Sequence, residues 1–161
     1  MSLRPLRPLQ ASDMDFAREM LVEAFRAWLD CGADVEPEMA GAYLAGWGRP
    51  GDRGVLATND DGEPIGAAWM RTFSLEAPGL AFVAPSVPEI VFAVEESERN
   101  AGLGTRLVEG LVLLAKADKC SFVSLATPRE GPARTIATKH EFADAGLSDE
   151  DDPLVILLAC L

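Results

Sequence analysis

The 161 residues of this chain match the length of one domain, and 48% of them are hydrophobic, which is enough for a buried core. The formal net charge is −12, from 14 basic and 26 acidic residues, and this charge excludes DNA and RNA as expected partners. No apolar run reaches the roughly 18 to 20 residues that cross a bilayer. Residues 1–10 interleave arginine and proline with leucine and lack the features of a secretory signal. We therefore expect one cytoplasmic domain over residues 1–161, with no membrane partner.

The first third of the chain predicts a strand followed by two helices. Residues 3–9 alternate apolar side chains with arginine and proline, and because proline cannot donate to a neighbouring strand, this strand belongs at a sheet edge. Ser12 followed by Asp15 predicts a helix N-cap, and apolar residues continue at helical spacing to about Asp30. A second, shorter helix is expected over about residues 37–46.

A β-hairpin is predicted next. Residues 55–58 and 65–73 are apolar and flank the sequence Asn-Asp-Asp-Gly at 59–62, which favours a tight reversal. A proline-rich connection over residues 75–88 then leads into the second half of the chain.

The second half predicts a strand–helix–strand crossover. An apolar strand over residues 89–94 is followed by a leucine stripe at helical spacing over 103–114 and by another apolar strand over 122–126. Such a crossover is expected to be parallel and right-handed. A short helix over residues 132–140 and a closing strand over 154–160 complete the pattern.

The three cysteines, Cys31, Cys120 and Cys160, lie far apart in the sequence and are odd in number. Neither a disulfide framework nor a pair of closely spaced metal ligands fits this arrangement. We interpret them as reduced, buried thiols, and we expect no metal site.

The segment between the strand and helix of the crossover has the composition of an anion site. Arg99 to Thr105 reads Arg-Asn-Ala-Gly-Leu-Gly-Thr, and free N–H groups at a helix start bind anions together with the helix dipole. The glycines let a phosphate approach without a Cβ in the way, and Asn100 tolerates positive φ. A Rossmann fingerprint would need glycine at Leu107, and a Walker loop would need lysine before Thr105, so neither nucleotide motif fits.

The spacing Arg99, Gly102 and Gly104 resembles the R-x-x-G-x-G signature of the GNAT N-acetyltransferases, and it lies after a strand and before a helix, as in that family. The resemblance implies an α/β (α+β) GNAT fold, with a mixed central sheet of about six to seven strands flanked by about four helices. It also implies acetyl-CoA as cosubstrate. The alternative is that the two glycines only make a tight turn and that Arg99 is a solvated loop charge.

By resemblance, cofactor binding falls on the end of the strand and the start of the helix. The residues implied are Phe92, Ala93, Val94, Arg99, Asn100, Ala101, Gly102, Leu103, Gly104 and Thr105. The backbone of residues 92–94 is expected to pair with the pantetheine arm and to polarise the thioester carbonyl.

The helix over residues 132–140 keeps part of the family pattern, which is Asn-Pro-Ala, then Leu-Tyr, then Gly-Phe. Pro132, Ala133 and Phe142 match, Ile136 replaces the leucine, and Gly131, Ala137 and Glu141 replace the asparagine, tyrosine and glycine. The usual general acid is therefore absent. Tyr43, Ser124 or Thr138 either substitutes for it or is structural.

A base must remove a proton from an acceptor amine, whose pKa lies near 10. Glu89 at the start of the cofactor strand is the predicted base by position and resemblance, with Glu95 or Glu96 next, and the alternative is a surface glutamate at a strand end. We interpret His140 as a residue that interacts favourably with the helix dipole, and not as a catalytic residue.

An acceptor pocket is implied beside the third strand and second helix of the family. The side chains there are Tyr43, Trp47, Trp69, Arg71 and Phe73, and the alternative is that they belong to the core.

These residues predict an N-acetyltransferase that transfers acetyl from acetyl-CoA to a primary amine of a small molecule or protein. The alternative is a CoA-binding sensor without turnover, motivated by Gly131, Ala137 and Glu141. A third hypothesis is an interaction scaffold that does not bind CoA. Exposed strand edges would allow a homodimer.

Overall fold

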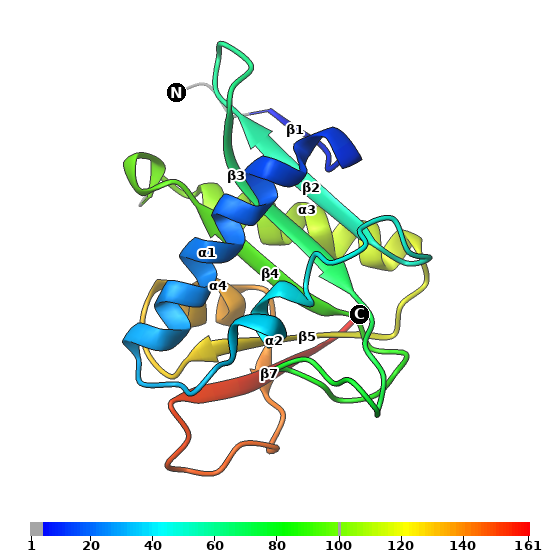
Figure 1. Cartoon of the computed structure of the whole chain (residues 1–161), viewed down its shortest axis with the longest axis vertical. Coiled ribbons are helices and arrows are strands. Elements are labelled where there is room, and N and C mark those ends of the chain that lie inside the picture. Colours follow the sequence, from blue (N-terminus) through cyan, green and yellow to red (C-terminus); the bar gives the residue numbers. More distant parts are fainter. Residues whose placement is uncertain (1–4, 100) are drawn as a thin grey trace.

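Seven strands form one mixed sheet in the computed structural model, which describes residues 5–99 and 101–161 (Figure 1). The strands are β1 (Leu6–Pro8), β2 (Arg53–Thr58), β3 (Pro64–Arg71), β4 (Glu89–Val94), β5 (Phe122–Pro128), β6 (Ala143–Asp144) and β7 (Leu154–Cys160). Their order is β1-β2-β3-β4-β5-β7-β6, and neighbours are antiparallel except for the parallel pair β4 and β5. The helices are α1 (Met14–Asp30), α2 (Pro37–Gly41), α3 (Leu103–Ala117) and α4 (Pro132–Lys139), with 3-10 turns η1 (Ala11–Asp13) and η2 (Glu96–Glu98). The predicted α/β architecture is confirmed.

The first helix begins on a different cap from the predicted one. Ser12 lies inside η1, and the carboxylate of Asp13 accepts a 2.8 Å hydrogen bond from the amide of Gln10. Arg7 on β1 donates two 2.8 Å hydrogen bonds to the same carboxylate, and these lower the pKa of Asp13. Helix α1 therefore has no side-chain hydrogen bond at its cap, and the Asp13 carboxylate instead joins the start of η1 to Arg7 of β1.

The second helix is shorter than predicted. Helix α2 ends at Gly41, and the chain continues in turns to Gly46, where φ is +64°. The buried guanidinium of Arg71 donates hydrogen bonds to the carbonyl oxygens of Ala42 (2.9 Å) and Ala45 (2.5 Å). Because a side chain already satisfies these two carbonyls, the segment needs no further helical turn.

Strand boundaries differ from prediction mainly at the ends. Strands β4 and β7 have the predicted bounds, whereas β3 ends at Arg71 instead of residue 73 and β5 extends to Pro128. Strand β6 was not predicted, because two exposed residues carry no alternation of apolar and polar side chains. It lies at the sheet edge opposite β1, which is an edge strand as predicted.

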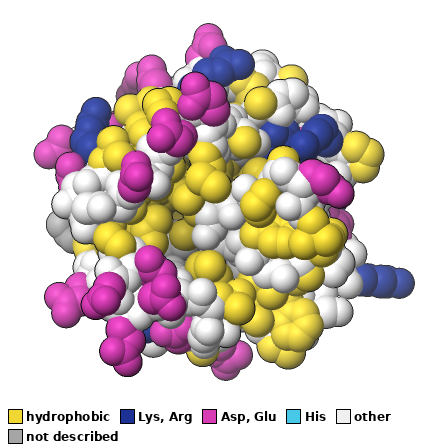
Figure 2. All heavy atoms as spheres, turned by 60° about the horizontal axis from the view of Figure 1, so that its bottom comes forward, with side chains coloured by type: hydrophobic (Ala, Val, Ile, Leu, Met, Phe, Trp, Pro, Cys, Tyr) yellow, Lys and Arg dark blue, Asp and Glu magenta, His cyan; other side chains and the backbone are white. Residues whose placement is uncertain are grey.

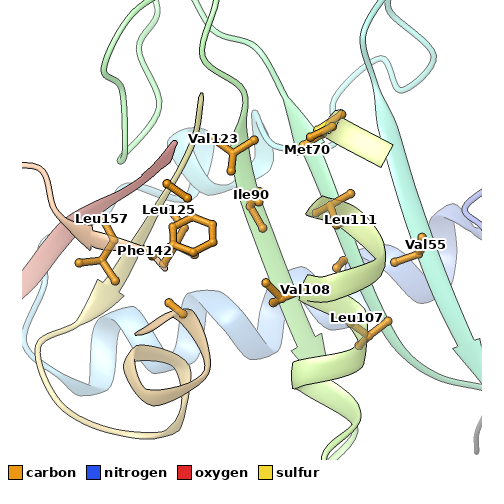
Figure 3. Close-up of a cluster of buried hydrophobic side chains, with 14 of the residues drawn as sticks. Val55, Met70, Ile90, Leu107, Val108, Leu111, Val123, Leu125, Phe142 and Leu157 are labelled. Carbon is orange, nitrogen blue, oxygen red and sulfur yellow. The ribbon is translucent and has the colours of Figure 1, made fainter. Parts of the chain in front are cut away.

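Helices α3 and α4 cover one face of the sheet. Figure 3 shows Leu107, Val108 and Leu111 of α3 directed at the sheet, where Met70 and Ile90 lie. The three α3 side chains are fully buried, and each contributes about 1.5–3 kcal/mol by leaving water. Because α3 packs against the centre of the sheet, it fixes the C-terminal end of the loop that precedes it.

Helices α1 and α2 cover the opposite face. Leu21 and Trp28 of α1 belong to a second buried cluster that also contains Val91 of β4 and Trp69 of β3. The indole N–H of Trp69 donates to the carbonyl oxygen of Tyr43 at 3.1 Å, which fixes the segment after α2 to the sheet. Within the described residues, no helix is long and apolar enough to span a bilayer.

The parallel strands β4 and β5 share a single paired position and then diverge (Figure 1). Glu89 pairs with Ser124, and the amide of Ser124 donates to the carbonyl oxygen of Pro88 at 3.0 Å. Beyond this point, towards the start of α3, the facing backbone groups of the two strands are not paired with each other. The sheet is thus open at its centre, between β4 and β5. Each of these strands is paired on its other side, β4 with β3 and β5 with β7.

Candidate functional site

A narrow hollow of about 60 Å³ lies where β4 and β5 diverge, and we call it the β4–β5 groove. Its lining comes from four elements, namely Ala24, Ala27 and Trp28 of α1, Ile90, Val91 and Phe92 of β4, residues 125–128 of β5, and Ala133 of α4. The lining is mainly apolar, and the strand backbone supplies unpaired N–H and C=O groups. An extended ligand that carries amides can pair with such groups as an added strand would.

Residues 99–105, the predicted phosphate loop, lead from η2 after β4 into the first turn of α3. Gly102 is the N-cap of α3 with φ at +80°, a conformation that other residues adopt at a cost. Among the residues that the structure describes, no atom lies within 4 Å of the position that a Cβ on Gly102 would occupy. The amides of Leu103, Gly104 and Thr105 form the first turn of α3 and lack acceptors inside the helix. The open side and the amides together fit an anion such as a diphosphate.

The second glycine of the motif has a packing role that sequence reasoning missed. A Cβ on Gly104 would lie 2.8 Å from Cδ1 of Ile136, so the absent side chain lets α4 approach the first turn of α3. Phe92 of β4 lies next to the same position, at 3.7 Å. The two glycines therefore serve different purposes, because Gly102 supplies the backbone conformation and Gly104 the close packing.

The structure brings the two halves of the predicted cofactor set close together, and Phe92 of this set lines the groove. Phe92 and Ala93 are half-buried and Val94 is buried, while Ala101 and Gly102 are exposed beside the buried Leu103. Asn100 lies outside the described residues. The strand end and the helix start are thus adjacent, as a ligand that spans both would require.

Arg99 is paired rather than freely solvated. Its Nη2 donates to Oε2 of Glu23 on α1 at 3.0 Å, and its Nε donates to the carbonyl oxygen of Val94 at 3.3 Å. Glu23 also accepts from Arg26 at 2.7 Å. These contacts tie the phosphate loop to α1, although the Arg99 side chain remains 46% exposed and can reach an added anion.

Glu89 is fully buried, so the alternative of a surface glutamate is wrong. Its Oε1 accepts hydrogen bonds from the Tyr43 hydroxyl at 2.6 Å and from the Ala81 amide at 2.9 Å. Its Oε2 has no hydrogen-bond partner among the described residues. Burial raises the pKa of Glu89 above its ordinary value, and hydrogen bonding from Tyr43 and from the backbone of Ala81 and Gly79 only partly opposes this. A buried carboxyl group with a raised pKa therefore lies at the closed end of the β4–β5 groove.

The three hydroxyl groups considered as general acids all have partners. Tyr43 is buried, accepts from the Leu80 amide at 2.9 Å, and has a pKa raised well above its ordinary value by burial. Ser124 is buried and donates to the carbonyl oxygen of Ala81 at 2.7 Å. Thr138 is exposed on α4 and donates to its own helix. Tyr43 and Ser124 therefore hold the segment around Ala81 over the closed end of the groove.

The side chains predicted for an acceptor pocket form part of the core. Arg71 is 1% exposed and makes a 2.7 Å ion pair with Asp52. Its guanidinium carbon lies 5.6 Å from the ring centre of Trp47. Trp69 is fully buried, and Phe73 packs edge-on against Tyr43 at 4.9 Å. These side chains support the segment that carries Tyr43, and the acceptor-pocket interpretation of Arg71 is wrong because its donors are already occupied.

A larger hollow of about 480 Å³ lies between α1 and the turn after β4. Glu19, Glu23, Glu95 and Glu96 are among its lining residues. Carboxylates repel phosphate, so this hollow does not suit the diphosphate of CoA despite its size. Glu95 and Glu96, the alternative bases, lie here at the opposite end of β4 from Glu89.

His140 lies at the C-terminal end of α4, as predicted. Its Nε2 is 3.1 Å from the carbonyl oxygen of Thr105 in α3. Because a carbonyl only accepts, Nε2 carries the hydrogen in this contact. The imidazole thus links the end of α4 to the first turn of α3, and no catalytic contact is required of it.

The match to known sequences identifies the family. Residues 14–139 match the Acetyltransferase (GNAT) family, and the chain belongs to this family. No curated protein matched the sequence. The groove, the phosphate loop and the helix order therefore belong to a GNAT acetyltransferase domain.

Solved structures share the fold over almost the whole chain. A ribosomal-protein-alanine N-acetyltransferase from Brucella melitensis is 18% identical, with a TM-score of 0.70 over 98% of this chain and 99% of that chain. A GNAT superfamily phosphinothricin acetyltransferase from Sinorhizobium meliloti, in complex with AcCoA, is 19% identical, with a TM-score of 0.70 over 99% and 89%. An N-acetyltransferase from Staphylococcus aureus Mu50 is 17% identical, with a TM-score of 0.68 over 99% of each chain. At these identities the likeness concerns the fold.

Proposed function

We propose that this protein transfers the acetyl group of acetyl-CoA directly to a primary amine. The observation that carries the proposal is that Phe92, which lines the β4–β5 groove, also lies next to Gly104 in the first turn of α3. Pantetheine carries amides that suit the unpaired strand groups, and the diphosphate suits the helix amides. The cosubstrate would then extend from the phosphate loop along β4 towards Glu89.

The reaction removes one proton from the attacking amine and exchanges a C–S bond for a C–N bond. The neutral amine nitrogen attacks the thioester carbon, the C–N bond forms and the C–S bond breaks, and the nitrogen loses a proton that ends on the leaving thiolate as the CoA thiol. Backbone N–H groups of β4 that face the groove would stabilise the oxyanion. The products are an N-acetyl amide and CoA, and no other reactant is required.

Glu89 is the proposed base. An ammonium group has a pKa near 10 and must lose its proton before attack, and a carboxylate whose pKa is raised by burial accepts protons more readily near neutral pH. No tyrosine stands at residue 137, where the buried Ala137 lies. A thiol with a pKa near 8.5 leaves tolerably well as thiolate, so slow turnover needs no general acid.

The charge of the protein supports a cationic acceptor, either a small amine or an amine of a protein. Figure 2 shows Asp and Glu side chains gathered along one side of the face that forms the bottom of Figure 1. With a net charge of −12, the field of the protein attracts ammonium groups. The names of the Brucella and Sinorhizobium proteins, both acetyltransferases, agree with this class of reaction.

Binding and turnover are tested separately. Acetyl-CoA at 100 times its dissociation constant should stabilise the protein by about 2.7 kcal/mol, which raises Tm by several degrees. The variant Gly102→Val should abolish this shift. Gly62→Val is the matched control, because Gly62 has nearly the same φ (+82°) and equally open surroundings in the distant hairpin turn. A normal shift with Gly102→Val would place the site elsewhere.

Turnover is followed by thiol release with a panel of primary amines. We expect amine-dependent release with ternary-complex kinetics, and Glu89→Gln should lower kcat by about 10²- to 10⁴-fold while sparing the thermal shift. Binding of acetyl-CoA without thiol release for any amine would instead indicate a CoA sensor. No thermal shift at all would contradict both.

A further inference from the structure

We infer that the indole of Trp28 forms the end wall of the acyl pocket and restricts the donor to short acyl groups. This inference rests on the proposed transfer from acyl-CoA, and it names a residue of α1 that sets donor specificity. Trp28 lines the β4–β5 groove and is only 5% exposed. It therefore lies at the buried side of the groove rather than at its mouth.

The neighbours of Trp28 on α1 leave the groove open beside it. Ala24 and Ala27 also line the groove, and Ala27 is exposed while Ala24 is half-buried. Their short side chains leave space between α1 and the diverging strands, and the large indole then closes that space. The small volume of about 60 Å³ is consistent with a group of a few heavy atoms.

The position of Trp28 relative to the closed end of the groove makes its indole a wall. Its ring centre lies 5.9 Å from that of Tyr43, and the Tyr43 hydroxyl in turn contacts Glu89. Val91, the β4 residue that shares the groove and the buried cluster with Trp28, lies two positions from Glu89. An acyl group held on the β4 backbone near Val91 would therefore lie against the indole, close to the Tyr43–Glu89 pair.

The indole is also held in place from behind. The side chain packs within the buried cluster under α1, which also contains Leu21, Tyr43 and Val91. The indole cannot move out of the groove without losing these contacts, because side chains in a well-packed interior have little room to move. Longer acyl groups would consequently clash or remain outside the groove.

The experiment measures the dissociation constants of free CoA, acetyl-CoA and butyryl-CoA by calorimetry for the wild type, Trp28→Phe and Trp28→Leu. Each methylene admitted to an apolar pocket changes affinity by roughly 10- to 200-fold. We expect the preference for butyryl-CoA over acetyl-CoA to rise at least about tenfold in Trp28→Leu, with a smaller rise in Trp28→Phe. The affinity for free CoA, which has no acyl group, should stay unchanged.

Two further variants keep the test decisive. Ala24→Leu fills the groove from a position one helical turn before Trp28 on α1 and should weaken acetyl-CoA binding more than free CoA binding, even if Trp28→Leu fails to fold. Leu29→Ala, at a 45% exposed position next to Trp28 that does not line the groove, should leave all three affinities unchanged.

The outcomes separate this inference from the proposed function. Suppose that the wild type binds acetyl-CoA, that folded Trp28→Phe has the same ratio of butyryl-CoA to acetyl-CoA affinity as the wild type, and that Ala24→Leu weakens the binding of all three ligands equally. The end-wall assignment is then wrong, and the transferase proposal stands. If the wild type binds none of the three, the proposed function fails and the end wall fails with it.

Discussion

The hydroxyl of Tyr43 donates a 2.6 Å hydrogen bond to Oε1 of Glu89, joining residues 46 positions apart in the sequence. Tyr43 comes from the turns after α2 and Glu89 from the first position of β4. Both are buried, and the contact is charge-assisted whenever the carboxyl group is ionised. This pair links the segment that follows α2 to the closed end of the β4–β5 groove.

Tyr43→Phe should shift the pH dependence of activity. Without the hydroxyl donor, the ionised form of Glu89 loses a hydrogen bond, so the pKa of Glu89, already raised by burial, rises further. The acidic limb of kcat/KM should therefore move to higher pH, with a loss of about 1.5–3 kcal/mol in stability. Phe73→Leu, which alters the ring contact with Tyr43 but keeps the hydroxyl, should leave the limb in place. An identical profile for Tyr43→Phe would show that Glu89 is not the titrating base.

Stability should also depend on pH through Glu89. Its pKa is raised in the folded state above the ordinary 4.5, so the folded protein holds this proton more tightly than the unfolded chain does. The resulting stabilisation is fully present below pH 4.5 and is lost as the pH rises through the folded-state pKa. Urea denaturation across this range should therefore show the wild type losing stability relative to Glu89→Gln as the pH rises. Parallel curves would contradict the burial of an ionisable group here.

Gly79→Ala should disturb the same carboxylate. A Cβ on Gly79 would overlap both carboxylate oxygens of Glu89, which Tyr43 and Ala81 hold in place. We expect a destabilisation of about 1–3 kcal/mol and a lower kcat, with acetyl-CoA binding retained. Gly41→Ala is the control, because no atom lies within 4 Å of its Cβ position and the change should be neutral or slightly stabilising. Full activity of Gly79→Ala would argue that the position of the carboxylate is unimportant.

Glu23→Gln should strengthen acetyl-CoA binding. The substitution removes the charge that holds Arg99 at 3.0 Å and leaves the guanidinium available to a phosphate. Exposed ion pairs are worth about 0–1 kcal/mol, so we expect a gain of up to about fivefold in affinity at low salt that fades as salt screens it. Asp15→Asn removes a charge from the same helix, in an exposed pair with Arg18, and should have little effect. Weaker binding by Glu23→Gln would mean that the pair helps to shape the loop.

Glu141→Gly should stabilise the fold. Glu141 has φ at +66°, the left-handed conformation that follows the end of α4, and it stands where the family has glycine. Relief of this strain should add about 1 kcal/mol, or roughly 2–4 °C in Tm. Glu141→Ala keeps the Cβ and should show no such gain. A destabilised Glu141→Gly protein would indicate that the glutamate side chain makes a compensating contact.

Much of the fold was predictable because its signals are local. The apolar strand at residues 89–94, the hairpin and the leucine stripe of α3 each follow from side chains that are close together in the sequence. The turn before α3 was predictable for the same reason, since the glycines that make it lie directly before the leucine stripe of the helix. These elements depend on periodicity and on backbone φ, which neighbours decide.

The rest depended on partners that are distant in the sequence. Arg71 ends α2 early through two carbonyls, and Glu23 holds Arg99 across 76 positions. Nothing near residue 104 indicates that Ile136 fills the space beside it.

The sequence by itself determines the strand–helix–strand crossover, the glycine turn before α3 and the resemblance to the GNAT family. Whether Glu89 is exposed or buried, and which side chain closes the groove, was decided only by tertiary structure. The physical reason is that desolvation and packing depend on the segments that surround a group, and those segments come together only when the sheet forms.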